Sequence, residues 1–369
     1  MSRLAKIYWP IIVGIVALSA AVFWACVAYQ AQELRIGKTP QAQKLSAYAT
    51  IRAEKGDFSG VIAVAQDNKL LLERGYGYAN SAQKIVNTPQ TKFCIASVGK
   101  LFTAVAVAQL VEQGKIAFDA PIGTYISGFP SNIADNVTIA ELLDMTGGFG
   151  NVASVTADKP LTLSDLMKPI YVESLQSKPG AAFNYSNDGY IVLGAIIQRV
   201  SGEPYATYIK QHIFALAGMY DTDITAYVPA KVSNMAHGYA SQNGRFTDIS
   251  TLYQIGNPSG GAYSTAGDLL KFAHAFMSHQ LLSAAMTNTI LSPRIATPQP
   301  GGPPVDAYTY GFGYQKENGV TFVGHNGGTP GYEDQLDMYP GKGYAVVVLT
   351  NQDGSMVPMI RQSEQLLTQ

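Results

Sequence analysis

Ser97 and Lys100 lie three residues apart at the start of a strongly apolar segment. Residues three apart on a helix share a face, so the Lys100 amine can reach the Ser97 hydroxyl. A serine alcohol becomes a useful nucleophile when a neighbour takes its proton, and apolar surroundings favour the neutral, basic form of lysine. A second Ser-x-x-Lys pair, Ser81 and Lys84, lies in a polar stretch with no apolar helix behind it. The context therefore favours Ser97 over Ser81 as the nucleophile. A helix-capping serine beside a surface lysine remains the structural alternative for Ser97.

Tyr185 and Asn187 form a second candidate element, at a predicted junction between a loop and a helix. A phenol beside a lysine ammonium can be held partly as phenolate, and can then take the Ser97 proton and pass it to a leaving group. The Asn187 amide can orient Lys100 and donate to a substrate carbonyl. A tyrosine near a helix start with an asparagine cap is the structural alternative. Either Lys100 or Tyr185 can be the base at this stage.

The third candidate element holds His325, Gly327 and Gly328, and follows an apolar run at 320–323. A strand lined by small residues lets a ligand lie against its backbone. The N–H groups of Gly328 and Ser97 can together hold an oxyanion. His325 adds a polar or cationic group that faces a substrate carboxylate or ester. A histidine that serves only the structure of a glycine-rich turn is the alternative.

The sequence gives little support for other known catalytic motifs. There is no G-x-S-x-G motif, which argues against an α/β-hydrolase triad. The five histidines form no H-E-x-x-H pattern, so neither a metal site nor a cofactor is predicted. The two cysteines, Cys26 and Cys94, cannot build a disulfide framework, and Cys94 is expected to be a buried packing thiol.

Composition describes a compact globular protein. The formal charge is −1, 14% of residues are charged and 47% are hydrophobic. These values exclude a disordered, collagenous or nucleic-acid-coating chain, so no nucleic-acid partner is expected. No pattern indicates an oligomeric state.

The N-terminal segment predicts a membrane helix. Arg3 and Lys6 precede an uncharged, mostly apolar run at 7–28, which is about 33 Å long as a helix and sufficient to span a bilayer. Both tryptophans, Trp9 and Trp24, lie near its ends, as in interfacial aromatic belts. We expect residues 1–29 to be an uncleaved signal anchor, with a cleaved signal peptide as the alternative. The basic N-terminal side places the rest of the chain outside the cytoplasm.

The remaining chain reads as a linker, 30–44, and one domain, 45–369. Strand patterns occur near both ends, at 61–65, 70–78, 310–315, 320–323, 332–339 and 344–350. Helical patterns occur between and after them, at 93–113, 190–200, 204–216, 268–277 and from 356. The prediction is an α+β fold with one antiparallel sheet built from 45–115 and 301–369, flanking helices, and an inserted all-helical region at 116–300.

Taken in order, Ser97-x-x-Lys100, Tyr185-x-Asn187 and His325-x-Gly327 resemble the motifs of a serine hydrolase family. This is the family of class C β-lactamases and D-alanyl-D-alanine carboxypeptidases, whose relatives include family VIII carboxylesterases and D-aminopeptidases. The resemblance implies a β-lactamase/transpeptidase-like fold and an acyl-enzyme at Ser97. It makes Lys100 and Tyr185 the proton-transfer pair, Asn187 the orienting amide, and Ser97 and Gly328 the oxyanion donors.

One departure from the family pattern bears on substrate. Class C β-lactamases usually carry lysine where His325 stands, whereas carboxypeptidase-like and esterase-like relatives often carry histidine. We therefore expect a membrane-tethered hydrolase in the periplasm that acts on a small-molecule or peptidoglycan-like peptide or ester, ahead of a class C-type β-lactamase. The alternative from another class is a catalytically idle binding or scaffold relative, which would have no need of Ser97, Lys100 and Tyr185 together.

Overall fold

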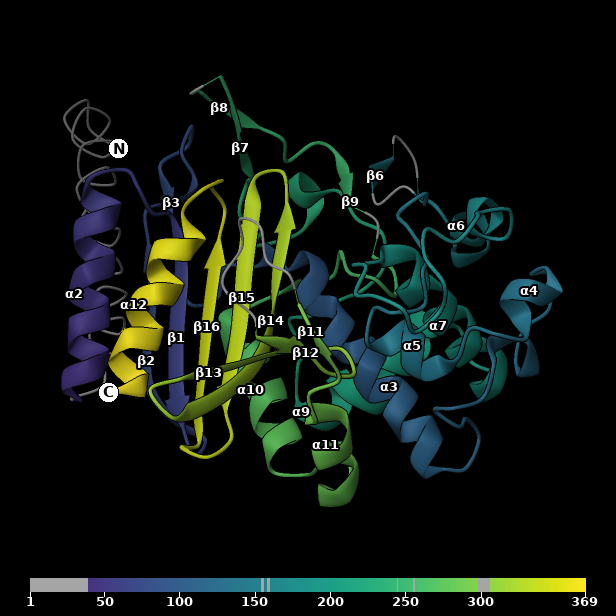
Figure 1. Cartoon of the computed structure of the whole chain (residues 1–369). Helices are drawn as coiled ribbons and strands as arrows, with labels where there is room; N and C mark the ends of the chain where they lie inside the picture. The colour runs from purple at the N-terminus through teal and green to yellow at the C-terminus, as the bar shows by residue number, and fades with distance from the viewer. Residues whose placement is uncertain (1–38, 154–155, 158–159, 244, 255, 298–305) are drawn as a thin grey trace, which may run out of the picture.

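The computed structural model describes residues 39–153, 156–157, 160–243, 245–254, 256–297 and 306–369. Within these residues an eight-stranded antiparallel sheet has the order β11-β12-β13-β14-β15-β16-β1-β2. Helices α2 (Pro40–Glu54) and α12 (Met356–Thr368) cover one face of the sheet, and the inserted region packs against the other face (Figure 1). The predicted fold class, an antiparallel sheet with flanking helices and a helical insertion, is confirmed.

The central strands join the two ends of the chain. β1 (Gly60–Gln66) lies between β2 (Lys69–Tyr76) and β16 (Tyr344–Thr350), and it pairs with β16 over its whole length. The sheet continues from β16 through β15 (Tyr332–Tyr339), β14 (Val320–Thr329), β13 (Gly313–Glu317), β12 (Ala307–Tyr308) and β11 (Ile295–Ala296).

The run of apolar residues in β1 reflects burial on both faces. Val61 and Ala63 pack into the core that the sheet shares with the inserted region. Ile62 and Val64 pack into a second core with α2 and α12. Because successive strand residues point to opposite faces, a continuous apolar run requires cover on both sides.

The inserted region contains most of the helices of the domain, and some of them have defined start and stop signals. Ser186 caps α7 (Asn187–Ser201) by accepting from the Gly189 N–H, and Gly202 ends the helix at a φ of 79°. A capping box formed by Thr138 and Glu141 begins α5 (Ile139–Leu143). The α-helices between β2 and β11 are α3 (Lys100–Glu112), α4 (Ser131–Ala134), α5, α6 (Leu163–Ile170), α7, α8 (Tyr205–Ile209), α9 (Ala215–Ala217), α10 (Ala266–Met277) and α11 (Ala284–Leu291).

The inserted region also contains short strand pairs, so the expectation of an all-helical insertion is wrong in detail. β7 (Tyr239–Gln242) pairs with β8 (Arg245–Asp248), and β6 (Thr156–Ala157) pairs with β9 (Tyr253–Gln254). These pairs are too short for the strand pattern to stand out in the sequence.

The segment before α3 differs from the predicted buried helix at 93–113. Phe93–Cys94 is strand β5, which pairs with β10 (Tyr263–Ser264), and Ala96–Gly99 is a 3₁₀ turn, η1. Backbone groups before Ser97 therefore bond to a neighbouring strand instead of along a helix, although the same residues are as buried as predicted.

The N-terminal boundary also differs from the sequence prediction. Residues 40–44 belong to α2 and not to a linker, with Thr39 as the N-cap and Pro40 at the first helical position. Ala42, Leu45 and Ala49 of this helix are buried. The predicted membrane segment at 7–28 lies outside the described residues, and no helix among the described residues has the length and apolarity to cross a membrane.

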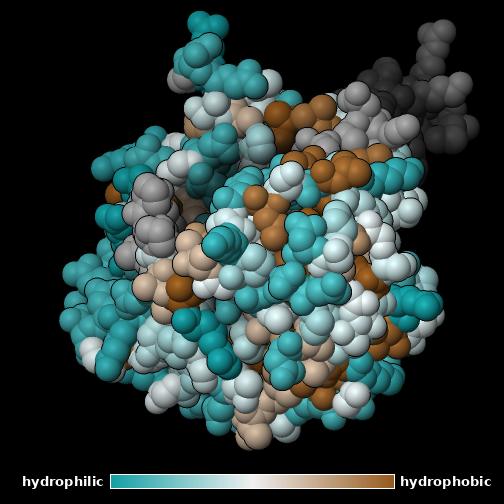
Figure 2. Space-filling view, turned by 45° about the vertical axis from the view of Figure 1, so that its right-hand side comes forward, coloured by the Kyte–Doolittle hydropathy of each residue, from teal (hydrophilic) through white to brown (hydrophobic). Residues whose placement is uncertain are grey.

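The face shown in Figure 2 carries hydrophilic, intermediate and hydrophobic residues side by side. Single exposed apolar side chains, such as Val172 and Tyr220, are ordinary features of a folded surface. The chemistry is therefore sought in the interior cavities.

Candidate active site

The Ser97 hydroxyl and the Lys100 amine meet at the junction of η1 and α3. Ser97 is partly exposed, whereas Lys100 is fully buried because α3 is covered on nearly all sides. Residues i and i+3 eclipse in a 3₁₀ turn, which places both side chains on one side of η1. The Lys100 Nζ lies 3.3 Å from the Ser97 Oγ.

Three oxygen atoms surround the Lys100 amine. Its Nζ donates to the Ser259 carbonyl and to the Asn187 Oδ1, each at 2.7 Å, and the Ser97 Oγ is the third neighbour. Burial lowers the pKa of Lys100 well below its usual range. A neutral amine has two N–H groups and one lone pair. With both N–H groups taken by Ser259 and Asn187, the lone pair faces the Ser97 hydroxyl and can accept its proton.

The loop that carries Ser259 approaches η1 closely because it contains glycine. Gly260 has a φ of 151°, and a Cβ there would lie 2.5 Å from the Ala96 carbonyl oxygen. Only glycine allows this contact. The close approach is what brings the Ser259 carbonyl to Lys100.

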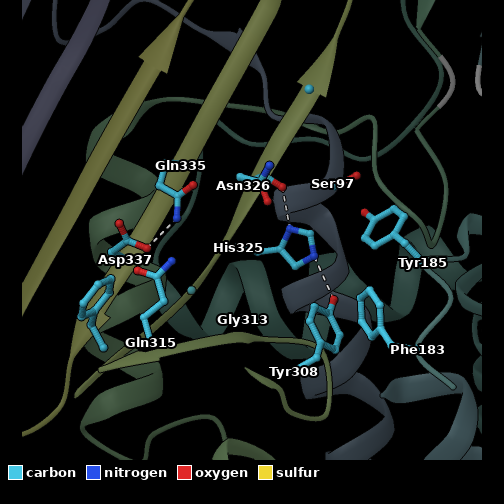
Figure 3. Close-up of a pocket in the computed structure, with 13 residues that line it drawn as sticks. Ser97, Phe183, Tyr185, Tyr308, Gly313, Gln315, His325, Asn326, Gln335 and Asp337 are labelled. Atoms are coloured by element: carbon cyan, nitrogen blue, oxygen red, sulfur yellow. Dashed lines mark hydrogen bonds between the residues drawn. The ribbon is translucent and has the colours of Figure 1, made fainter. Parts of the chain in front are cut away.

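Tyr185 lies just before α7, with its hydroxyl directed toward Ser97 (Figure 3). The Lys100 Nζ is 4.7 Å from the centroid of its ring. Burial raises the pKa of the Tyr185 phenol, and the hydrogen bond with Ser97 only partly opposes this effect. Tyr185 is therefore a neutral O–H group. The expectation of a partial phenolate assumed a charged lysine beside it, and burial of Lys100 disfavours that charge.

Asn151 fixes the positions of Tyr185 and Asn187. Its Oδ1 accepts from the Asn187 N–H at 2.7 Å, and its Nδ2 donates to the Tyr185 carbonyl at 3.1 Å. The Ser186 hydroxyl donates to the Gly150 carbonyl on the same loop. These bonds hold the start of α7 against residues 150–151.

His325 on β14 uses both ring nitrogens within the protein. A carbonyl oxygen can only accept, so the contact of Nδ1 with the Asn326 carbonyl places the ring proton on Nδ1. The Nε2 then accepts from the Tyr308 hydroxyl at 2.9 Å (Figure 3). Burial and the neighbouring Lys100 lower the pKa of His325 to about 3. Of the polar and cationic forms expected for His325, this lowered pKa favours the neutral, polar form.

The end of β14 runs beside η1. β13 pairs with β14 only as far as Gly324, and η1 contacts the segment beyond. A Cβ at Gly327 would lie 2.5 Å from the Ile95 carbonyl oxygen, so glycine sets the spacing between strand and turn. Gly328 is exposed and lines the cavities next to Ser97.

Replacing Gly327 by alanine is expected to displace β14 from η1, because the added carbon would overlap a backbone oxygen. A displacement of about 1 Å at a reacting group costs about a hundredfold in rate. We expect a drop of that size in kcat/KM for any substrate. Gly341→Ala is the matched control, since its Cβ would meet nothing within 4 Å. Equal activity of both variants would contradict the proposed role of this contact.

Two cavities meet at Ser97. The larger one, of about 400 Å³, is lined on this side by Ser97, Phe183, Tyr185, Tyr308 and His325. The smaller one, of about 60 Å³, reaches Asn187 and Ser259. Five of the seven predicted site residues line one or both cavities, and they come from three distant parts of the chain: Ser97, Tyr185, Asn187, His325 and Gly328. The other two, Lys100 and Gly327, line neither cavity but contact Ser97 and Ile95.

The match to known proteins decides the family. The profile of the family described as Beta-lactamase matches residues 45–367. The chain belongs to the beta-lactamase family. Within this family, the putative penicillin-binding protein PbpX of Bacillus subtilis (strain 168) is 30% identical over 322 residues, covering 86% of this chain and 75% of the relative.

Solved structures of the beta-lactamase family agree with the fold. The crystal structure of a penicillin-binding protein from Bacillus halodurans has a TM-score of 0.76 and 30% identity, and covers 86% of this chain and 98% of that one. D-amino acid amidase from Ochrobactrum anthropi SV3, in complex with D-phenylalanine, has a TM-score of 0.77 at 22% identity, and covers 89% and 98% of the two chains. The second similarity shows the fold alone.

The sequence of this beta-lactamase-family chain did not identify three residues of the site: Asn151, Ser259 and Tyr308. Only Ser259 had a usable signal, the glycine pair that follows it. Cys94 is buried, and burial raises the pKa of its thiol to about 12, in keeping with the predicted packing role.

Proposed function

We propose that this chain is a serine hydrolase that forms an acyl-enzyme at Ser97 and releases it to water. The observation that carries the proposal is the setting of Lys100, a buried amine whose Nζ bonds to the Ser259 carbonyl and the Asn187 Oδ1 and lies 3.3 Å from the Ser97 Oγ. Burial lowers its pKa and so favours the neutral, basic form. An amine in this state is a general base prepared before the substrate arrives.

In the acylation step, the Ser97 oxygen attacks the substrate carbonyl carbon while its proton moves to the Lys100 Nζ. The N–H groups of Ser97 and Gly328 are the proposed donors to the oxyanion that forms. Tyr185, whose O–H faces Ser97, then gives its proton to the leaving oxygen or nitrogen as the bond breaks. The proton held on Lys100 restores Tyr185, and a water molecule later repeats the sequence on the acyl-enzyme.

The substrate class that fits best is an amide or ester, handled by a peptidase or carboxylesterase activity ahead of a β-lactamase activity. A β-lactam antibiotic carries a carboxylate beside its ring, and a basic side chain is the usual partner for such a group. His325 is neutral and has no free ring nitrogen. Among the described residues that line either cavity, none is an arginine or a lysine.

Labelling with a fluorophosphonate probe tests the function. Trypsin should release a labelled peptide of residues 93–100, because Lys92 and Lys100 bound Ser97 on both sides. Rates are then compared for p-nitrophenyl butyrate, a D-alanyl-D-alanine peptide and nitrocefin. The ester or the peptide should react faster than nitrocefin. An unlabelled protein would overturn the serine hydrolase proposal, and fastest turnover of nitrocefin would favour a β-lactamase.

The apolar N-terminal run at 7–28 adds a location to the proposal, with the domain on the outer side of the cytoplasmic membrane. Cell fractionation tests it, since the full chain should sediment with membranes. Recovery in the cytoplasmic fraction would contradict it.

A further inference from the structure

The larger cavity ends at a buried carboxyl group that the proposed mechanism does not use. Gln315, Gln335 and Asp337 line this part, which we call the acidic end, across the cavity from Tyr185 in Figure 3. Asp337 is 3% exposed and Gln335 is 7% exposed. A charged or polar side chain this deeply buried normally has a partner for each oxygen.

A glycine opposite Asp337 leaves the space into which its carboxyl group faces. Asp337 on β15 pairs with Gly324 on β14, and β13 reaches the same point through Gly313. A Cβ at Gly324 would lie 2.8 Å from the Asp337 Oδ1. Because Gly324 has no side chain, the carboxyl group borders the cavity and is not covered by the neighbouring strand.

Two oxygen atoms at the acidic end lack hydrogen-bond donors. Gln335 Nε2 donates to the Asp337 Oδ1 at 2.6 Å. The Asp337 Oδ2 and the Gln335 Oε1 are buried and have no partner among the described residues. The Gln335 Oε1 is an acceptor, and the Asp337 Oδ2 is an acceptor when the carboxyl group is ionised, so a ligand with N–H donors would satisfy both atoms.

The charges around the acidic end favour a positive group. Asp337 pairs with Val346, whose side chain packs on the α12 side of the sheet, so Glu364 on α12 lies on the same face as Asp337. Burial and this neighbouring carboxyl group raise the pKa of Asp337 to about 8. Burial and Glu317 on β13 raise the pKa of Glu364 and of Tyr339, while Arg361 opposes the shift at Glu364. A ligand cation beside Asp337 would stabilise the ionised carboxylate.

We propose that the acidic end binds an ammonium group of the substrate, so that the enzyme prefers amides or esters with one cationic arm. This inference rests on the proposed function, because it names the substrate class of the same site. An ammonium group has three N–H donors, two of which match the free oxygens of Asp337 and Gln335. A carboxylate in the same place would meet two acceptors and a negative charge.

The register of β14 sets the length of the cationic arm. Gly328, the proposed oxyanion donor, lies four residues along the strand from Gly324, which is about 13 Å. An extended chain advances about 1.2 Å per bond. The ammonium group should therefore be about ten bonds from the reacting carbonyl, and a short arm should not reach Asp337.

The test compares pairs of esters that differ only at the end of one arm, an ammonium group in one and an N-acetyl group in the other. Long-armed and short-armed pairs are made for the acyl arm and for the alcohol arm. The measured quantity is the ratio of kcat/KM within each pair, per active site titrated with fluorophosphonate. In the wild-type chain, the ratio should favour the ammonium ester in one long-armed pair and in neither short-armed pair.

Asp337→Asn should lower that long-armed ratio about tenfold or more, because a charge-assisted hydrogen bond is lost. Asp334→Asn is the matched control on the same strand, since Asp334 is equally buried and lines neither cavity near Ser97. It should leave the ratio unchanged. A long-armed ester that ends in a carboxylate should react slowly with the wild-type chain and faster with Asp337→Asn.

The outcomes separate this inference from the proposed function. Equal ratios for wild type and Asp337→Asn on both arms, with hydrolysis intact, would overturn the ammonium site alone. If the variant does not fold, the wild-type ratios decide, and equal values for long and short arms would overturn the site. A wild-type chain that takes no label and hydrolyses no ester would overturn the proposed function itself.

Discussion

A Ser97→Ala chain is expected to take no fluorophosphonate label and to lose about 10⁶-fold in kcat. The reason is that the acyl-enzyme forms on the Ser97 oxygen. Removing a nucleophile that works together with its general base lowers kcat by about this factor. The alanine lies in a turn whose neighbours are buried, so the fold should persist. Gel fluorescence of the labelled protein and initial rates on p-nitrophenyl butyrate measure the two effects.

The competing Ser-x-x-Lys pair supplies a matched control. Ser81→Ala changes the other serine with this spacing, which is exposed and is followed by an exposed Lys84. This variant should label and hydrolyse as the wild type does. Label retained by Ser97→Ala and lost in Ser81→Ala would show that the wrong serine was chosen.

Lys100→Met should lower kcat/KM by about 10³-fold, the usual range for loss of a general base. Methionine fills similar space in the apolar surroundings of α3 but has no lone pair to accept the Ser97 proton. The Ser259 carbonyl and the Asn187 Oδ1 also lose their donor, which costs about 1 to 3 kcal/mol for each buried group. Steady-state rates and thermal denaturation separate the catalytic loss from the loss of stability.

The dependence of kcat/KM on pH tests whether Lys100 is the base. Only the free amine accepts a proton, so wild-type kcat/KM should fall as pH falls through the pKa of Lys100, which burial places well below the usual lysine range. This acidic limb should disappear in Lys100→Met. If a Tyr185 phenolate were the base instead, activity would rise toward high pH, because burial raises the pKa of Tyr185. Disappearance of the limb in Tyr185→Phe, with Lys100→Met unaffected, would contradict the assignment.

The spacing of residues predicted which groups meet, but it did not predict their charges. Ser97, Lys100, Tyr185 and Asn187 come together as the motifs indicated. Their protonation depends on how deeply the fold buries each group, which no local pattern contains. His325 is the clearest case, because its tautomer is set by Tyr308 and by a backbone carbonyl.

The bounds of a helix or strand could be predicted where residues in the local sequence mark its ends. The strand at 332–339 and the strand at 344–350 have the predicted bounds. By contrast, β14 extends to Thr329, beyond the predicted 320–323, because pairing with β15 satisfies the backbone of a glycine-rich segment with low strand propensity. At β5, pairing with the distant strand β10 likewise overrides the local pattern, which predicted a helix.

The position of β1 between β2 and β16 has a consequence for how the chain reaches this structure. The partner of Gly60 is Thr350, so the central pairing must wait until nearly the whole polypeptide is available. Contacts of such long sequence separation slow folding, because closure of a large loop precedes any gain from the contact. Until β16 arrives, the apolar edge of β1 is open to other strands. A nascent chain therefore passes through an aggregation-prone stage that ends only when β16 pairs with β1.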